Sequence, residues 1–392
     1  MKRFLRGFWA VIIALTVLSI SGPVSAQTSL DPMLKPYLSR YDLPALAAAV
    51  VKNGKIVSAG AVGTRRAGEN IPVTINDRFH IGSDTKAMTA FLAAMLVEQE
   101  KLQWTSTVSD VFPELAEEMD PRLRAVMLQQ LLSHTSGIPS DNEDVLKVLG
   151  ESYAQEGNLD ELRYWLVRAW SKYPLASEPG EKFAYSNMGY VFAGAMIERR
   201  TGKTWEELIT EKIFKPLEMR TAGLGPQSSI GKIDAPLGHR IVNGKAKAML
   251  AGPCGDNPPI IGPAGLAHMS VLDFARWAGW NTGEGKRGPK LVKAETMKKL
   301  HTPVITMPMQ KTHTPGTPSE GKYAFGWGEL HPEWAPNPFL MHGGSNGMNL
   351  AKIWVDRKRD FAMVLMTNIG GVKADQAQDI LANELYAKFG RK

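Results

Sequence analysis

The segment 87–97 constrains the fold most, because the helix that it predicts is apolar nearly all the way round. It reads Ala-Met-Thr-Ala-Phe-Leu-Ala-Ala-Met-Leu-Val, and a helix without a polar face lies buried at the centre of a domain. Ser83 and Lys86 open this helix at positions i and i+3, so that the hydroxyl and the amine share one face. Apolar surroundings favour the neutral form of a lysine amine. A neutral amine can accept the proton of a serine hydroxyl and so activate it as a nucleophile.

The Ser-x-x-Lys pattern is weak evidence by itself, since about one occurrence is expected by chance in a chain of this length. This chain has three. Those at 229–232 and 319–322 lie among glycine and proline with no apolar helix after them, which is typical of loops. Ser83 and Lys86 are therefore the candidate nucleophile and base.

The first 26 residues have the pattern of a secretory signal peptide. Three basic residues within the first six precede an apolar run at 8–20, and small residues lead to an expected cleavage after Ala26. The run is short for a membrane span, and an uncleaved N-terminal anchor is the alternative. We expect an exported protein, periplasmic or secreted, that comprises residues 27–392 and has no stable membrane span after cleavage.

Composition argues against several classes of partner. The single cysteine, Cys254, cannot form an internal disulfide. Loss of the three basic residues at the N-terminus lowers the formal net charge from +7 to +4, and no basic block alternates with aromatic residues, so no nucleic acid is expected as a partner. The eight histidines are scattered outside any metal-binding motif, so no metal is expected.

Both ends of the chain predict strands of one antiparallel sheet. After a helix-like stretch at 31–41, the runs 45–51 and 55–62 flank Lys52-Asn53-Gly54, a hairpin signal. Strand-like runs around 349–355 and 361–367 precede an amphipathic helix at 374–389.

These patterns predict an α/β (α+β) fold, with an antiparallel sheet built from both chain termini and flanked by helices. The α/β lobe comprises about 27–101 and 301–392. The signals between about 102 and 300 are mainly helical, with long Gly/Pro-rich connections, and predict an inserted helical lobe. A cleft between two lobes is where a substrate pocket is expected.

Tyr185-Ser186-Asn187 is the only Tyr-x-Asn in the chain, and an amphipathic helix through Arg199 is expected after it. A tyrosine near an ammonium can share the role of base, and an asparagine can orient both a carbonyl and the lysine. The alternative is a turn at the start of a helix with a packed tyrosine.

The segment 342–347, His-Gly-Gly-Ser-Asn-Gly, comes just before a predicted strand. Glycine allows a substrate to approach the backbone of an edge strand, whose N–H groups can stabilise an oxyanion. A flexible turn is the alternative. The same segment also fits the Gly-x-Ser-x-Gly elbow of α/β-hydrolases, but that fold needs a histidine after the serine and His342 is the last one. Chain order therefore argues against Ser345 as a nucleophile.

Taken in order, Ser83-x-x-Lys86, Tyr185-x-Asn187 and His342-x-Gly344 resemble the three active-site motifs of the serine β-lactamase and penicillin-binding-protein-like family, of the class C and esterase type. The resemblance covers nearly the whole mature chain. Five further segments agree with it: 79–82 (Phe-His-Ile-Gly), 131–139 (Leu-Leu-Ser-His-Thr-Ser-Gly-Ile-Pro), 179–180 (Pro-Gly), 262–266 (Gly-Pro-Ala-Gly-Leu) and 323–328 (Tyr-Ala-Phe-Gly-Trp-Gly).

The resemblance implies that Ser83 is acylated while Lys86 and Tyr185 manage its proton. No metal or organic cofactor is implied. Deacylation needs a positioned water, for which Tyr185 and His342 are both candidates.

The resemblance also implies the binding residues. Asn187 would hold the substrate carbonyl or amide, and His342 would line the wall beside the acyl carbon. The backbone N–H groups of Ser83 and of Ser345, the residue after Gly344, would form the oxyanion hole.

The third motif departs from the antibiotic-related members, which usually have Lys-Thr/Ser-Gly where this chain has His342, Gly343 and Gly344. A neutral imidazole and a glycine hold a substrate carboxylate less well than a lysine and a hydroxyl. We therefore expect an esterase or an amidase/D-aminopeptidase-like enzyme that acts on a small-molecule ester, amide or peptide-like substrate. The alternatives are a β-lactamase or D,D-peptidase, and a non-catalytic protein that binds or senses cell-wall fragments. The oligomeric state is left open.

Overall fold

In the computed structural model, which describes residues 28–139, 142–250, 252, 255–308 and 320–391, a nine-stranded sheet has the order β1-β3-β2-β14-β13-β12-β11-β10-β9. The described strands are β1 (Thr28–Ser29), β2 (Ala45–Lys52), β3 (Lys55–Gly63), β4 (Arg78–His80), β5 (Gly223–Leu224), β6 (Gly238–Val242), β7 (Lys245–Met249), β8 (Ala267–Ser270), β9 (Ile305–Met307), β10 (Gly321–Tyr323), β11 (Gly328–Leu330), β12 (Phe339–Ser345), β13 (Leu350–Asp356) and β14 (Phe361–Thr367). The expected signal peptide and Cys254 lie outside the described residues.

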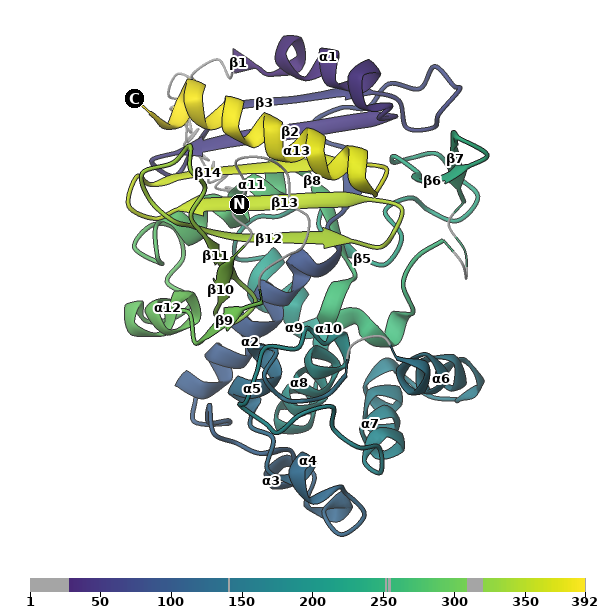
Figure 1. Ribbon diagram of the computed structural model, residues 1–392, viewed down its shortest axis with the longest axis vertical. Helices are drawn as coiled ribbons and strands as arrows, with labels where there is room; N and C mark the ends of the chain where they lie inside the picture. The colour runs from purple at the N-terminus through teal and green to yellow at the C-terminus, as the bar shows by residue number, and fades with distance from the viewer. Residues whose placement is uncertain (1–27, 140–141, 251, 253–254, 309–319, 392) are drawn as a thin grey trace, which may run out of the picture.

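Both ends of the chain meet at the centre of this sheet (Figure 1). β2 pairs antiparallel with β14, with Ala49 opposite Val364, and β14 pairs antiparallel with β13. The N-terminal hairpin β2–β3 lies where Asn53-Gly54 predicts its turn. The expected α/β fold with a sheet from both termini is confirmed.

The described α-helices are α1 (Asp31–Tyr41), α2 (Thr85–Glu98), α3 (Val108–Val111), α4 (Pro121–Arg124), α5 (Leu128–Leu132), α6 (Glu143–Glu151), α7 (Leu159–Trp170), α8 (Asn187–Thr201), α9 (Trp205–Ile209), α10 (Gly262–Gly265), α11 (Val271–Thr282), α12 (Ala294–His301) and α13 (Val372–Leu385). α1 and α13 cover one face of the sheet, and α11 covers the other (Figure 1). The remaining helices, apart from α12 and the upper end of α2, gather below the sheet.

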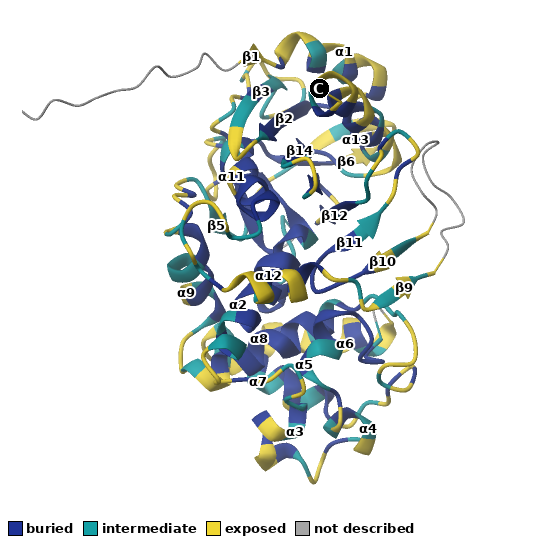
Figure 2. Cartoon of the chain, turned by 90° about the vertical axis from the view of Figure 1, so that its left-hand side faces the viewer, coloured by how far each residue is buried: buried dark blue, intermediate teal, exposed yellow. Residues whose placement is uncertain are grey.

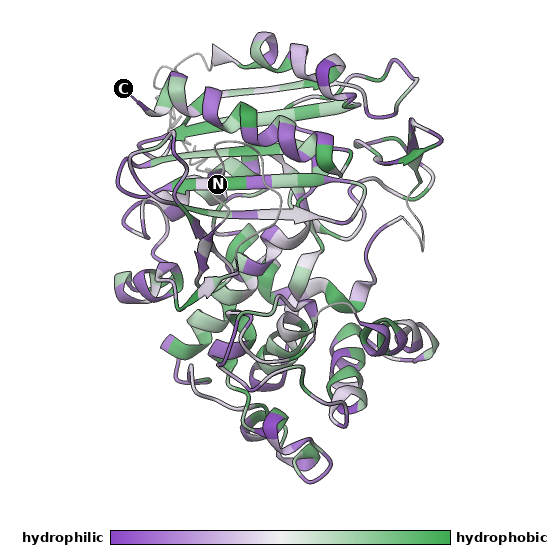
Figure 3. Ribbon diagram, in the orientation of Figure 1, coloured by the Kyte–Doolittle hydropathy of each residue, from purple (hydrophilic) through white to green (hydrophobic). Residues whose placement is uncertain are grey.

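Alternation along β2 separates two apolar cores. Leu46, Ala48 and Val50 pack on the side of α1 and α13, whereas Ala47 and Ala49 belong to the larger core on the opposite side. The central strands β2, β13 and β14 are mainly hydrophobic, while α13 carries many hydrophilic residues (Figure 3). A strand that is buried on both faces has no alternation of apolar and polar residues. The sequences of β2, β13 and β14 have this nearly continuous apolar pattern.

Helix α2 lies in the middle of the molecule, as its apolar sequence predicts. Every residue from 85 to 94 is buried, and Figure 2 shows the helix enclosed between the sheet and the lower helices. Ser83 itself precedes α2, in the 3₁₀ turn η1 (Gly82–Asp84). The candidate nucleophile therefore lies at the N-terminal end of the buried helix, where it is only half-buried.

The helix after Tyr185 differs from expectation. The sequence predicts an amphipathic helix here, but residues 188–198 of α8 are all buried, because α2, α5, α7 and α10 surround it. Its polar Glu198 is paired internally, since Arg163 of α7 donates to both of its carboxylate oxygens. The proposed division into two lobes stays a prediction; α11, inside the range 102–300, packs on the sheet. Within the described residues, no helix is long and apolar enough to cross a membrane.

One buried histidine gives a prediction for the pH dependence of stability. His301, at the end of α12, lies within 3.1 Å of Asn281 Oδ1, and burial, followed by the charge of Arg357, lowers its pKa from 6.5 to about 3. Between these values the unfolded chain binds a proton that the folded chain does not, so stability falls as the pH drops below 6.5. The free energy of unfolding should therefore fall by about 2 kcal/mol less between pH 7 and pH 5 in His301→Gln than in the wild type.

Urea unfolding at both pH values measures this difference. His331→Gln, the same substitution at an exposed position, is the control. An identical dependence in wild type and His301→Gln would show that His301 binds its proton equally well in the folded and the unfolded chain, which contradicts the lowered pKa.

Candidate active site

Lys86 and Ser83 meet at the lower edge of the sheet. Lys86 Nζ lies 3.0 Å from Ser83 Oγ and donates hydrogen bonds to Asn187 Oδ1 at 2.8 Å and to the Ala264 carbonyl at 2.7 Å. The lysine is fully buried (0% exposed). Because α2, α8 and α10 each supply one member of this cluster, the amine is held in place from several sides and aimed at the serine hydroxyl.

The turn that carries Ser83 is shaped by a glycine. Gly82 has φ +51°, and a Cβ at this position would lie 2.3 Å from the backbone nitrogen of Ser345, so only glycine fits. Thr85 Oγ1 donates to the Gly82 carbonyl at 2.7 Å and accepts from Ala267 N–H at 3.1 Å. These bonds fix η1 between the start of α2 and strand β8.

Strand β12 crosses directly over this turn. A Cβ on Gly344 would lie 1.9 Å from the Ile81 carbonyl oxygen and 2.6 Å from the backbone nitrogen of Ser83. The two backbones are therefore in close contact. The structure thus brings together the N–H groups of Ser83 and Ser345, the pair expected for the oxyanion hole.

The side chain of Ser345 is used within its own turn. Its hydroxyl donates to the Asn349 carbonyl at 2.6 Å and accepts from Gly347 N–H at 2.9 Å. These bonds support the sequence-based argument against a nucleophile elbow at this position.

Tyr185 lies beside the lysine. Its ring centroid is 4.8 Å from Lys86 Nζ, and the side chain is half-buried. The expected association of Tyr185 and Asn187 with Ser83 and Lys86 is thus present in the structure.

His134 supports Tyr185, a role that the sequence did not reveal. Their ring centroids are 4.2 Å apart, and His134 Nδ1 accepts a hydrogen bond from Ser186 N–H at 3.0 Å. Burial, followed by the charges of Lys86 and His342, lowers the pKa of His134 well below its usual value. A neutral ring therefore packs against the tyrosine. Segment 131–139 contributed to the family resemblance, but nothing in its pattern indicates this contact.

His342 lies on the wall of the site but faces inward. It is 6% exposed; its Nδ1 donates to the Gly343 carbonyl at 2.9 Å, and its Nε2 accepts from Tyr323 Oη at 3.0 Å. Burial, followed by the charge of Lys86, lowers its pKa to about 3. The third motif therefore presents a neutral imidazole, held by a tyrosine that sequence reasoning gave no role.

A carboxyl group lies beneath this wall. Asp84 is 1% exposed, and neither of its carboxyl oxygens has a hydrogen-bond partner among the described residues. Its Oδ1 is 3.8 Å from His342 Nδ1. Burial raises the pKa of Asp84 well above its usual value, although Lys86 and Lys352 act in the opposite direction. In the described part of the chain, no three His, Cys, Asp or Glu side chains form a group that could hold a metal ion.

Comparison with known proteins shows the family to which the chain belongs. The family model for Beta-lactamase matches residues 30–388. "Protein flp" of Staphylococcus aureus (strain MW2) is 24% identical over 355 residues, which cover 88% of this chain and 63% of that protein. Unguisins hydrolase ungD' of Aspergillus campestris is 27% identical over 290 residues, which cover 70% of this chain and 52% of that protein. The chain thus spans about half to two thirds of the length of these curated relatives.

Solved structures share the fold. The octameric penicillin-binding protein homologue from Pyrococcus abyssi has a TM-score of 0.71 and 25% identity, covering 90% of this chain and 76% of that chain. The D-amino acid amidase from Ochrobactrum anthropi SV3 has a TM-score of 0.70 and 18% identity, covering 93% of this chain and 98% of that chain. The chain therefore belongs to the beta-lactamase family.

Proposed function

We propose that this protein is an exported enzyme that hydrolyses esters or amides through an acyl-enzyme on Ser83. The observation that carries the proposal is the 3.0 Å contact between Lys86 Nζ and Ser83 Oγ, with the amine fully buried and bonded to Asn187. A nucleophile within hydrogen-bond reach of a base that is itself oriented by further groups is the arrangement of covalent catalysis. A protein that only binds cell-wall fragments has no need of it.

In the acylation step, Ser83 Oγ attacks the acyl carbon while its proton passes to Lys86 or Tyr185. The carbonyl oxygen becomes an oxyanion next to the N–H groups of Ser83 and Ser345. Collapse breaks the bond to the leaving group, which departs with the transferred proton. Water then attacks the acyl carbon and gives a proton to the same base. The bond between the acyl carbon and Ser83 Oγ breaks, Oγ takes that proton from the base, and the acid is released.

Tyr185 is the better candidate for positioning that water. Both ring nitrogens of His342 are engaged inside the protein, with Gly343 and Tyr323, and a low pKa keeps the ring neutral. Tyr185 is half-buried and lies beside Lys86. We therefore assign His342 to the wall of the site and Tyr185 to the positioning of the deacylating water.

The charge of this wall favours a neutral acyl group. His342 is neutral, and the side chain beneath it is the carboxyl of Asp84. Neither supplies the cation that would hold a substrate carboxylate. The name of one structural neighbour, a D-amino acid amidase, supports amides as one substrate class, and a curated relative is named a hydrolase of unguisins.

Covalent labelling tests the proposed nucleophile. Residues 27–392 are treated with a fluorophosphonate probe, and the adduct is located by mass spectrometry. We expect the adduct on Ser83 in the wild type and in the control Ser345→Ala, which keeps the backbone N–H, and no adduct in Ser83→Ala. Absence of labelling in the folded wild type would favour a binding protein, and an adduct on Ser345 would overturn the assignment.

A pair of substrates tests the proposed specificity. Two nitrophenyl esters of equal acyl length are compared, one with a methyl end and one with a carboxylate end. We expect kcat/KM to be about tenfold or more higher for the neutral ester, because no charge-assisted hydrogen bond rewards the carboxylate. Preference for the anionic ester, or efficient turnover of a penicillin, would support the β-lactamase or D,D-peptidase alternative.

A further inference from the structure

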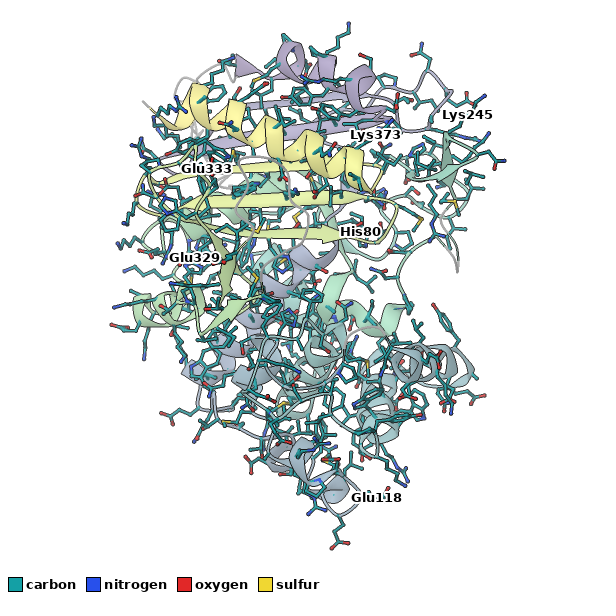
Figure 4. All side chains as sticks on the ribbon, viewed as in Figure 1. His80, Glu118, Lys245, Glu329, Glu333 and Lys373 are labelled. Carbon is teal, nitrogen blue, oxygen red and sulfur yellow. The ribbon has the colours of Figure 1, made fainter. Side chains whose placement is uncertain are left out.

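A buried aspartate joins the two chain segments that carry the proposed oxyanion hole. Asp256, which precedes α10, is 5% exposed at its side chain. Its Oδ1 accepts a hydrogen bond from Asn346 Nδ2 at 2.9 Å and lies 3.1 Å from His80 Nε2. His80 is the last residue of β4, and Asn346 directly follows β12. Figure 4 labels His80 at the level where β12 passes the start of α2.

The His80 side of this link leads to Ser83. His80 Nδ1 accepts a hydrogen bond from Gly82 N–H at 3.0 Å. Because Nδ1 accepts, the ring proton is on Nε2, which faces Asp256. His80 therefore connects the aspartate to the turn whose next residue is the nucleophile.

The Asn346 side leads to Ser345. Asn346 Oδ1 accepts from Met348 N–H at 3.2 Å and from Asn349 N–H at 3.0 Å, which closes the turn after β12. Its Nδ2 remains to donate to Asp256. The amide thus fixes the turn with one end and connects it to the aspartate with the other.

The charge of Asp256 strengthens both connections. Burial alone would raise its pKa, but His80, whose Nε2 lies 3.1 Å away, and the hydrogen bond from Asn346 outweigh burial and lower the pKa below its usual value. Asp256 is therefore ionised at neutral pH, and hydrogen bonds to an ionised acceptor are about twice as strong as neutral ones.

We propose that Asp256 is a positioning residue that sets the distance between the two N–H groups of the oxyanion hole, through His80 on one side and Asn346 on the other. The proposal rests on the proposed function, since it takes the Ser83 and Ser345 N–H groups as that hole. Donors placed at the position where charge develops stabilise the transition state more than the bound substrate. Loss of the link should therefore lower kcat and leave KM nearly unchanged.

Exchanging the side chains of Asp256 and Asn346 tests the proposed role of the contact between them. Asp256→Asn keeps the shape but removes the charge, and Asn346→Asp places two carboxylates face to face; each should lower kcat for a nitrophenyl ester by about tenfold to a hundredfold. The double variant Asp256→Asn/Asn346→Asp restores one donor opposite one carboxylate. The carboxylate introduced at position 346 keeps acceptors for Met348 and Asn349, so most of kcat should return.

The control is Asp110→Asn, which alters a hydrogen-bonded aspartate at the start of α3 and should leave kcat unchanged. Thermal unfolding is measured for every variant. A purely structural role predicts a lower unfolding temperature without a selective loss of kcat. If Asp256→Asn does not fold, Asn346→Asp tests the same link.

Affinity for a boronic acid that forms a tetrahedral adduct with the serine gives a second readout, which should weaken by the same factor as kcat. A folded Asp256→Asn that keeps kcat within twofold, or a double variant without recovery, would overturn the role of Asp256. Failure of the wild type to react with the fluorophosphonate would instead contradict the proposed function itself. Failure of the role of Asp256 and failure of the proposed function are thus distinguished by different measurements.

Discussion

Lys86→Ala is expected to lower the rate of Ser83 acylation by about a thousandfold or more. The amine lies 3.0 Å from Ser83 Oγ, and its removal takes away the proposed acceptor of the hydroxyl proton. Rapid mixing with a nitrophenyl ester measures the rate of the first turnover, and fluorophosphonate labelling reports the same step independently. Acylation within tenfold of the wild-type rate would exclude Lys86 as the base.

The substitution also has a structural cost. It leaves Asn187 Oδ1 and the Ala264 carbonyl without the lysine donor, and a buried acceptor that loses its partner costs about 1–3 kcal/mol. Circular dichroism and thermal unfolding must therefore show that Lys86→Ala is folded before its rate is interpreted.

Lys86→Arg separates the two possible contributions of the amine. A guanidinium keeps the positive charge but does not release a proton at accessible pH. If Lys86 acts as a base, Lys86→Arg should be as slow as Lys86→Ala. If its charge alone stabilised the oxyanion, Lys86→Arg should retain a large part of the wild-type rate.

The parts of the fold that follow from hydrophobic patterning could be predicted from the sequence. The apolar segment 87–97 indicates a buried central helix, and the turn at Asn53-Gly54 indicates the hairpin β2–β3; both are present. Each of these signals is local, since it depends on residues within about a dozen positions. The helix from Asn187 shows where local signals fail: its polar residues suggest a solvent-facing side, but Glu198 is paired with Arg163 inside the protein.

The groups of the candidate site also fall into two kinds, those that the sequence indicates and those that only the structure shows. Side chains with chemistry of their own, such as Ser83 and Lys86, are visible in the sequence, and the structure brings them together. The Ala264 carbonyl that holds Lys86 is a backbone group, so no residue type indicates it. Asp256 and His134 act through neighbours more than 50 residues away in the chain or through ring contacts, and only the folded chain defines such pairs.

Gly344→Ala is expected to lower kcat/KM by about a hundredfold to a thousandfold, the effect of losing one donor of an oxyanion hole. The new Cβ would lie 1.9 Å from the Ile81 carbonyl oxygen and within 2.7 Å of the backbone nitrogens of Ser83 and Asp84. These neighbours are backbone atoms that cannot rotate away. Strand β12 must therefore move off the turn η1, which separates the N–H groups of Ser83 and Ser345.

Gly343→Ala is the matched control, because it makes the same chemical change one residue earlier on the same strand. Successive residues of a strand point to opposite faces, and a Cβ on Gly343 would meet its nearest atoms only at 3.9 Å. This variant should keep kcat/KM within about threefold of wild type. Gly344→Ala should also unfold more easily, by about 1–3 kcal/mol, since the contact is overpacked.

The comparison of the two variants distinguishes a specific effect on the oxyanion hole from a general loss of stability. If β12 and η1 must remain in contact for catalysis, Gly344→Ala stays slow even where thermal unfolding shows it fully folded, and its affinity for a boronic acid falls with kcat/KM. If Gly344→Ala and Gly343→Ala have equal activity, the close approach of Gly344 to Ser83 only serves packing. The oxyanion would then have to be stabilised by groups other than the Ser345 N–H.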